Sequence, residues 1–299
     1  MRKALAILLV FILSGLGSAQ ALKGLKKRVA VIDFEDQAGY GHNIGRGLAD
    51  MLVTRLVKAG KFIVVERGEL QRVLEEQSLG MSGLVTPQSA AKVGQLLGVE
   101  LLVTGSVSEF GEKNTKLGGA IGKLGFGGKV SKRKARAVVD IRLVNTSTGE
   151  IVMAEKAEGE ASSTSLDRVR FSDIDFGNPT TWDRTILGKA AREAIDKCVD
   201  YIAAAMANIP WQGKIIKVNN DGTVYMKPGS EGGVQVGMEF AVYSKGEELI
   251  DPDTGLSLGS EEQLIGKIKV IQDVANGKAA KAVIVSGTGF NVGDMVRVK

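Results

Sequence analysis

Residues Lys134 to Glu158 read KARAVVDIRLVNTSTGEIVMAEKAE, and this stretch decides the fold. Its first half carries apolar side chains at alternate positions, namely Ala137, Val139, Ile141 and Leu143. A period of two is typical of a strand with one buried face. Asn145 to Gly149 supply a turn, in which glycine takes a positive φ and short polar side chains bond to the local backbone. Ile151 and Met153 resume the pattern, so the stretch predicts a complete β-hairpin.

The region before this hairpin alternates between short apolar strands and segments with apolar residues at helical spacing. Glycines just past two of the helices, Gly60 and Gly98, are typical helix ends. The elements expected in chain order are a strand at Arg28 to Phe34, a helix at Ile44 to Ala59, a strand at Phe62 to Val65, a helix around Leu70 to Gln77, a helix from Thr86 to Leu97 and a strand at Leu101 to Phe110. This order predicts a mixed α/β (α+β) sheet with packed helices.

Asp183 to Asn208 is expected to be the longest helix. Its apolar residues form a single stripe, composed of Leu187, Ala191, Ala194, Ile195, Cys198, Ile202, Ala205, Met206 and Ile209. Such a stripe is typical of a helix face that packs on a core. Cys198 is the only cysteine, so it cannot form an intramolecular disulfide, and we expect it to act as a small buried hydrophobe.

The pattern changes at Pro210, after which short strands alternate with glycine-bearing turns at intervals of about ten residues. Asn219 to Gly222 are a strong hairpin signal. The strands expected here are at 214–218, 223–226, 240–243, 264–274, 279–285 and 295–298. We therefore predict a small all-β C-terminal domain at 209–299, either a barrel or a sandwich, after an α/β domain at 22–208.

Five segments of the α/β region carry a family resemblance when they are taken together and in order. They are VAVIDFEDQAG, GRGLADMLVTRL, FIVVERGELQRVL, AAKVGQLLGVELLVTGSV and VDIRLVNTSTGEI. The chain resembles the curli production assembly/transport (CsgG) family over most of Arg28 to Met206. The resemblance implies a non-catalytic, periplasmic or outer-membrane-associated protein that binds partners and forms a ring. The best-known member of that family forms an oligomeric secretion channel in the bacterial outer membrane.

A second resemblance concerns the C-terminal region. The segments GKIIKV, GVQVGMEFAVY, DPDTG and GDMVRV resemble the C-terminal module of some envelope-assembly proteins, including a flagellar-ring component. This resemblance also implies a role in the cell envelope.

Residues 1–21 are expected to be a secretory signal peptide, with Arg2 and Lys3 before an apolar run and a small-residue cleavage site at Ala19 to Ala21. The apolar run is shorter than the roughly 20 residues that a membrane-spanning helix needs. An uncleaved N-terminal anchor is the alternative. Leu13 to Leu16 resembles a bacterial lipoprotein box in which leucine replaces the lipidated cysteine of the channel-forming family members.

Two stretches bear on membrane insertion, Lys113 to Arg136 and Ala161 to Thr181. The resemblance implies that the first forms a membrane-spanning β-hairpin. Lys132, Arg133 and Lys134 are consecutive, however, so at least one of them would face lipid, where a basic residue costs about 2 to 4 kcal/mol at mid-bilayer. The second stretch is crowded with charges in its middle. We therefore expect a soluble or surface-lying loop, with pore strands as the alternative.

Two groups of residues before the first helix have spacings that also occur in binding sites. Gly41, Gly45 and Gly47 reproduce a spacing used for binding a dinucleotide pyrophosphate, but they begin six residues beyond Glu35 instead of directly at the strand end. Asp33, Glu35 and Asp36 cluster at the end of the first strand, where a metal or acid/base chemistry is conceivable. They lack an accompanying cysteine, and the only histidine, His42, lies on the following loop. Solvated charges or local caps are the expected roles of these carboxylates.

A faint calcium-loop pattern occurs at Asp251 to Gly255, with Glu261 and Glu262 downstream. Gly255 stands where a third ligand is required, so a plain β-turn is expected. The sequence therefore predicts no catalytic, cofactor-binding or metal residue. The formal net charge of +5 is too small to indicate nucleic acid as a partner.

The function expected from these observations is support of secretion or of the assembly of surface or envelope structures, through protein–protein binding and as an oligomeric ring. Its expected partners are envelope or secreted proteins and identical copies of the chain, in the periplasm or at the periplasmic face of the outer membrane. Three alternatives stay open: an outer-membrane secretion channel of the curli type, a periplasmic activator of the cell-wall synthesis machinery, and an enzyme using the acidic cluster near Asp33.

Overall fold

The computed structural model describes residues 24–41, 43–66, 68–69, 72–73, 93–94, 96–116, 131–163, 185–252 and 257–298. They form two compact units, one built from residues 29–60 and 64–207, the other from 208–299 with 61–63 and the described residues before Val29. The expected signal peptide, the lipoprotein-box segment, His42 and most of the two helices expected between Leu70 and Leu97 lie outside the described residues.

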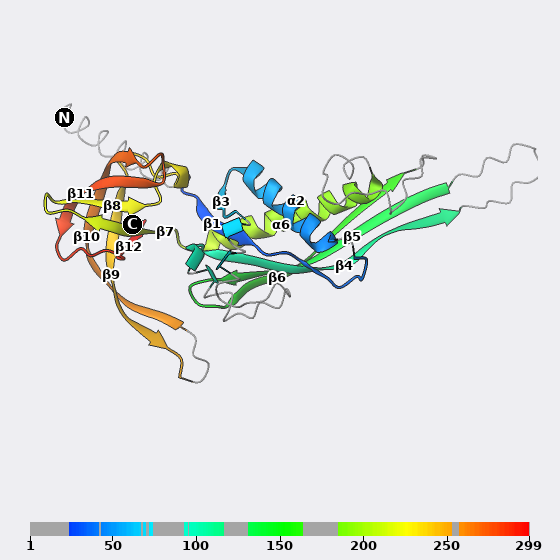
Figure 1. Cartoon of the computed structure of the whole chain (residues 1–299), viewed down its shortest axis with the longest axis horizontal. Coiled ribbons are helices and arrows are strands. Elements are labelled where there is room, and N and C mark those ends of the chain that lie inside the picture. Colours follow the sequence, from blue (N-terminus) through cyan, green and yellow to red (C-terminus); the bar gives the residue numbers. More distant parts are fainter. Residues whose placement is uncertain are drawn as a thin grey trace, which may run out of the picture. The chain divides into compact units, whose positions relative to one another are not determined.

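The first unit is a mixed sheet with helices packed on it (Figure 1), as the sequence predicted. The strand order is β3-β1-β4-β5-β6, and β2 pairs with β4. β1 runs parallel to β4, whereas β4, β5 and β6 are antiparallel neighbours. The elements of this sheet and its helices are β1 (Lys27–Val31), β2 (Glu35–Asp36), α2 (Ile44–Ala59), β3 (Phe62–Val64), β4 (Leu101–Lys116), β5 (Ser131–Asn145), β6 (Ile151–Ser163) and α6 (Ile186–Asn208), of which the first residues of β1 and β3 are grouped with the second unit.

Helices α2 and α6 lie beside each other on the sheet (Figure 1), and an ion pair of 2.6 Å between Arg55 and Asp196 joins them. Helix α2 ends as predicted, because Gly60 adopts a left-handed conformation with φ 67° and donates its N–H to the Val57 carbonyl. The whole predicted stripe of α6, including Cys198, is buried. The two long helices therefore form the layer that covers the sheet.

The sheet itself is buried according to the predicted period of two. Ala137, Val139, Ile141 and Leu143 of β5 are each at most 1% exposed. On the opposite face near the start of β4, a second apolar cluster forms from Ala30, Ile32, Val65, Val93, Val99, Leu102 and Val144. The two faces of the sheet are thus both covered at this end, which makes it the hydrophobic centre of the unit.

The predicted hairpin of β5 and β6 is confirmed by continuous antiparallel pairing. The return strand differs from the expected pattern, because Ile151 is 47% exposed and burial starts only at Ala157. The reason is that β6 is the edge of the sheet, and the described contacts of α6 with it begin near Gly159. Strand pattern alone does not reveal which part of an edge a helix covers.

The loop expected at Lys113 to Arg136 is partly wrong. Both of its ends are strand, since β4 and β5 stay paired in register out to Lys116 and Ser131. Residues 117–130 between them lie outside the described part of the chain. Of the second stretch, Ala161 to Ser163 end β6, and the rest also lies outside the described residues. Extended pairing of these strands was missed because glycine and lysine are weak strand signals.

The second unit contains a closed β-barrel, in the order β10-β11-β8-β7-β12-β9. All six strands expected from the sequence are present, although β9 and β10 are longer than predicted. Closure selects the barrel over the sandwich and leaves no free edge within it. The elements are β7 (Gln212–Val218), β8 (Thr223–Lys227), a short 3-10 helix η3 (Ser230–Gly232), β9 (Glu239–Ile250), β10 (Ser257–Val274), β11 (Ala279–Gly287) and β12 (Met295–Arg297).

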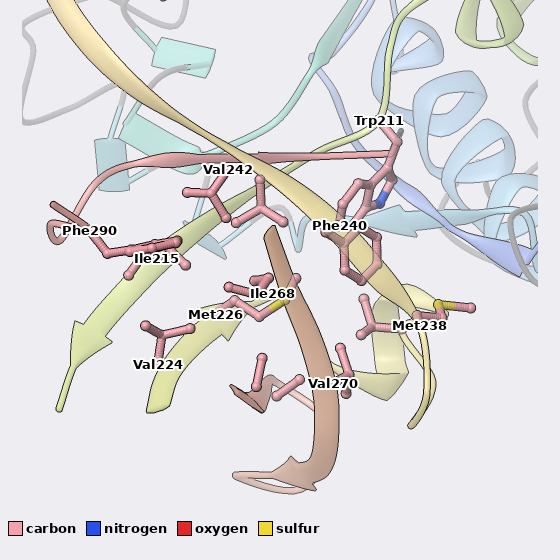
Figure 2. Packing of buried hydrophobic residues seen from close by; sticks show 14 residues of the cluster. Trp211, Ile215, Val224, Met226, Met238, Phe240, Val242, Ile268, Val270 and Phe290 are labelled. Carbon is pink, nitrogen blue, oxygen red and sulfur yellow. The ribbon is translucent and has the colours of Figure 1, made fainter. Parts of the chain in front are cut away.

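Apolar side chains from all of these strands fill the barrel (Figure 2). Trp211 and Phe240 stack with ring centroids 5.1 Å apart, next to Met238. Val224 and Met226 of β8 are fully buried, so the residue between them, Tyr225, points outward. Across both units, none of the helices that the structure describes combines the length and apolarity needed to span a bilayer.

Candidate functional site

The carboxylates at the end of β1 are engaged in a local turn. Asp36 accepts hydrogen bonds from the backbone N–H groups of Gly41, at 2.6 Å, and Tyr40, at 3.3 Å. Glu35 accepts a long 3.5 Å bond from the side chain of Gln37. Asp36 thus has the capping role that the sequence favoured for this cluster.

The glycines after this turn have packing roles. A Cβ added at Gly45 would lie 1.8 Å from the carbonyl oxygen of Phe34, so glycine allows α2 to approach the strand end. Gly41 takes a left-handed conformation with φ 68°, which suits the turn. Gly41 and Gly45 therefore each have a role in the local structure.

Of the acidic residues in the calcium-loop pattern, Glu262 is paired with an arginine of another barrel strand. Both Arg297 Nη atoms contact the Glu262 carboxylate, at 2.5 and 2.7 Å, and the guanidinium lies 5.5 Å from the centre of the Tyr243 ring. Glu262 thus joins β10 to β12 within the barrel. Asp253 to Gly255 lie outside the described residues.

Cys198 lies fully buried in the stripe of α6. Burial raises the pKa of its thiol to about 12. The thiolate is the nucleophile and the metal ligand of cysteine chemistry, so this side chain is inert in the folded protein.

The feature with the clearest capacity to bind another molecule is the outer edge of β6. One half of this edge is sealed by α6, where Lys197 Nζ donates to the carbonyl of Glu158 at 2.5 Å and Glu193 accepts from the N–H of Glu160 at 3.2 Å. Lys197 and Glu193 also contact each other at 3.0 Å. The hydrogen bond from Lys197, followed by that from the Glu160 backbone, lowers the pKa of Glu193.

Along the other half of the edge, the described part of the chain provides no partner strand or helix. A strand residue directs its N–H and C=O to the same side, and alternate residues point to opposite sides. Because the outward groups of Glu160 and Glu158 meet α6, the outward series continues at Lys156 and Ala154, which are both exposed. No described residue hydrogen-bonds to these outward groups, and Ile151 and Val152 beside them are 47% and 42% exposed. We call Ile151 to Ala157 the open edge.

A band of charges lies on the sheet next to the open edge. Arg136 contacts Glu109 at 3.2 Å and Glu158 at 2.9 Å, and Lys156 contacts Glu158 at 3.2 Å. The hydrogen bond from Lys156 and the nearby Arg136 charge lower the pKa of Glu158. These side chains are all 42–49% exposed, so the pairs add little stability and leave the charges available to a partner.

The outer ends of β4 and β5 are basic. Lys113 lies directly opposite Lys134 in the ladder, and like charges in opposite positions repel. Arg133 partly offsets the burial that raises the pKa of Glu112. The backbones of the consecutive bases Lys132, Arg133 and Lys134 are therefore part of a paired strand.

Sequence reasoning missed the edge because which strand ends a sheet depends on topology. Two signals were nevertheless present. Glu193 and Lys197 are four residues apart on the polar side of a helix, and Gly159 interrupts a strand. A Cβ at Gly159 would lie 1.9 Å from the carbonyl oxygen of Ala190, so this glycine marks where α6 meets β6.

Comparison with known proteins gives the following similarities. The chain is 28% identical over 197 residues to a protein named as a lipoprotein of Neisseria meningitidis serogroup B, covering 63% of this chain and 80% of that protein. It is 26% identical over 162 residues to the curli production assembly/transport component CsgG of Salmonella typhimurium, covering 50% of this chain. That match spans 58% of the curli protein, which is less than two thirds of its length.

Among solved structures, a lipoprotein from Neisseria meningitidis aligns with a TM-score of 0.36 and 13% identity, over 61% of this chain and 99% of that one. The C-terminal domain of LpoB from Escherichia coli aligns with a TM-score of 0.31 and 16% identity, over 45% of this chain and 83% of that one. The family model described as curli production assembly/transport component CsgG matches residues 14–227. The chain therefore belongs to the CsgG family.

Proposed function

We propose that this CsgG-like cell-envelope protein is non-catalytic and supports the secretion or assembly of surface structures by binding other proteins, as a ring of identical copies. The observation that carries the proposal is the open edge of β6. An exposed strand edge offers a row of main-chain donors and acceptors to an added strand. Natural proteins normally protect such edges, and here α6 protects only the half from Glu158 onward.

The geometry limits what can pair there. An added strand finds outward groups at Ala154 and Lys156 and meets the α6 side chains at Glu158. Exposed Ile151 and Val152 supply apolar contacts, and the Arg136, Glu158 and Lys156 charges supply selectivity. If the added strand comes from a different surface of a second copy, the contact is heterologous, and such contacts close into rings when the rotation permits.

The proposed location follows from the first residues of the chain. Cleavage after Ala21 would release the mature protein into the periplasm, with an α/β domain at 22–208 and a β domain at 209–299. N-terminal sequencing of periplasmic material should then begin at Leu22. Recovery of unprocessed protein from the cytosol alone would contradict the proposed location.

The edge is tested with Ala154→Pro. Proline removes one outward N–H without touching the bonds to β5, and edge strands tolerate it at such positions. Ala154→Ser keeps the N–H and is the matched control. Native mass measurement should give one discrete ring mass for the wild type and for Ala154→Ser, and monomer for Ala154→Pro with an unchanged circular dichroism spectrum.

Three results of that measurement would count against the proposal. A wild-type protein that is monomeric would contradict the proposed ring. A dimer alone would indicate two β6 edges pairing with each other, which closes the assembly at two copies. An unaltered ring in Ala154→Pro would place the contact on another surface.

A second candidate function, a secretion channel of the curli type, is favoured by one observation. β4 and β5 remain paired out to Lys116 and Ser131, so both ends of the stretch that the resemblance assigns to a pore are strand. Against it stand Lys132, Arg133 and Lys134, since one face of β5 must carry at least one of them. Discrete, stable conductance steps from purified protein in liposomes would establish the channel, and their absence at ring-forming concentrations would exclude it.

A further inference from the structure

A band of side chains crosses the exterior of four neighbouring barrel strands. In the ladder, Lys217 of β7 lies opposite Tyr225 of β8, Tyr225 lies opposite Lys281 of β11, and Lys281 lies opposite Gln272 of β10. Tyr225 points outward because its neighbours on β8 fill the core (Figure 2). The four residues therefore form one continuous row on the outer surface.

At each end of the row the strand register shifts by one residue, and the extra residue is an exposed isoleucine. The register shifts between Ile215 and Lys217 on β7 and between Val270 and Gln272 on β10, which leaves Ile216 and Ile271 as the extra residues. They are 41% and 44% exposed. Bulges commonly re-aim a side chain for a purpose, and two of them at opposite ends of one row place apolar groups on both sides of Tyr225.

The row is positively charged. Lys217 Nζ and Lys281 Nζ lie 5.8 and 5.9 Å from the centre of the Tyr225 ring, on its two flanking strands. Within the described residues, neither amine forms an ion pair with a carboxylate. Asp221 is the acidic group that Lys281 influences, and its oxygen is already bonded to Thr223. The two lysines thus present their amines beside Tyr225 without an ion pair among the described residues, and Asp221 is the acidic group nearest in influence to Lys281.

We propose that this row, together with Ile216 and Ile271 at its two ends, binds the surface of an anionic phospholipid membrane. A soluble anion would need the lysines alone, whereas the lipid interface also accommodates apolar side chains and favours tyrosine, whose ring is apolar and whose hydroxyl is polar. Lysines beside them extend their amines to the phosphates. The inference is independent of the ring and of the open edge.

The test uses the full chain and vesicles of two compositions, phosphatidylcholine alone and phosphatidylcholine with phosphatidylglycerol. Flotation should recover the protein with the anionic vesicles, and the recovered fraction should fall as the salt concentration rises. Lys217→Gln/Lys281→Gln should weaken this binding roughly 30-fold, since each lysine near an anionic surface contributes about fivefold. Ile216→Ser/Ile271→Ser should weaken it while the charge is unchanged.

The matched control is Lys61→Gln/Lys189→Gln, which removes two exposed lysines elsewhere and should leave binding within about twofold of the wild type. Trp211 fluorescence checks that each barrel variant is folded. Equal binding to both vesicle types, or an equal loss in the control, would overturn the inference. So would displacement of the protein from vesicles by soluble single-stranded DNA acting through the same lysines, because the row would then be a general polyanion site.

Discussion

Replacing Gly159 by alanine tests how α6 and β6 are held together. The added Cβ would lie 1.9 Å from the carbonyl oxygen of Ala190 and 2.6 Å from the amide nitrogen of Ala194. Both neighbours are helix backbone, so the clash is not relieved by a side-chain rotation. Restoring a 3.4 Å separation from the oxygen requires α6 to move by about 1.5 Å, the difference between the two distances.

The expected cost follows from that displacement. Overpacking a core costs about 1–3 kcal/mol, and a rigid backbone neighbour places this substitution at the upper end, near 3 kcal/mol. For a unit of this size, each kcal/mol lowers Tm by about 2–4 °C, so we expect a loss of about 6–12 °C. The sealed half of the β6 edge should loosen with it, because Lys197 and Glu193 are carried by the same helix.

The assay is thermal unfolding followed by circular dichroism at 222 nm, which reports the sheet unit because α2 and α6 both belong to it. Gly68→Ala is the matched control, since a Cβ there meets nothing closer than 3.9 Å and the residue is helical. The control should be unchanged or more stable by up to about 1 kcal/mol. A Gly159→Ala protein that loses less than 1 kcal/mol would refute the close contact.

Three further outcomes are expected. Cys198, whose pKa burial raises to about 12, should not react with a thiol reagent at pH 8 until the protein unfolds; prompt reaction in the native protein would contradict its burial. In an NMR titration, the pKa of Glu193 should lie below the ordinary value of 4.5, and the pKa of Glu112 should lie above it. The stability that Glu193 contributes is therefore present above pH 4.5 and is lost as the pH falls through its lowered pKa. Phe240→Ala should destabilise the barrel by about 3–5 kcal/mol, because it removes the ring that stacks on Trp211. In a Trp182→Phe background, Trp211 fluorescence should then show unfolding at a lower temperature, while the transition in circular dichroism at 222 nm keeps its Tm.

Much of the fold could be predicted because local patterns and tertiary burial agree. The structure confirms three local predictions: the alternating burial in β5, the buried apolar stripe of α6 and the end of α2 at Gly60. The barrel strands were predicted because Asn219 to Gly222 and the later glycines punctuate them. Closure into a barrel instead of a sandwich depends on long-range pairing of β12 with β7 and β9, which no local pattern encodes.

The candidate site was less predictable. The open edge exists because β6 ends the sheet and α6 seals only one half of it, and both facts arise from topology. The alternating apolar pattern predicts that Ile151 is buried, yet its side chain is exposed because α6 does not reach this part of β6. The local abundance of lysine and glycine predicts a loop at the outer ends of β4 and β5. The structure has strands there, because the pairing between β4 and β5 continues out to Lys116 and Ser131.

Hydrogen exchange at the outward amides of β6 tests the central claim most directly. At concentrations where the protein is assembled, the amides of Ala154 and Lys156 should exchange slowly, and they should exchange quickly after dilution to monomer. Glu160, which α6 already holds, should be protected in both states. Fast exchange of Ala154 and Lys156 in the assembled protein would contradict the account, because it would show that no strand is added at the open edge.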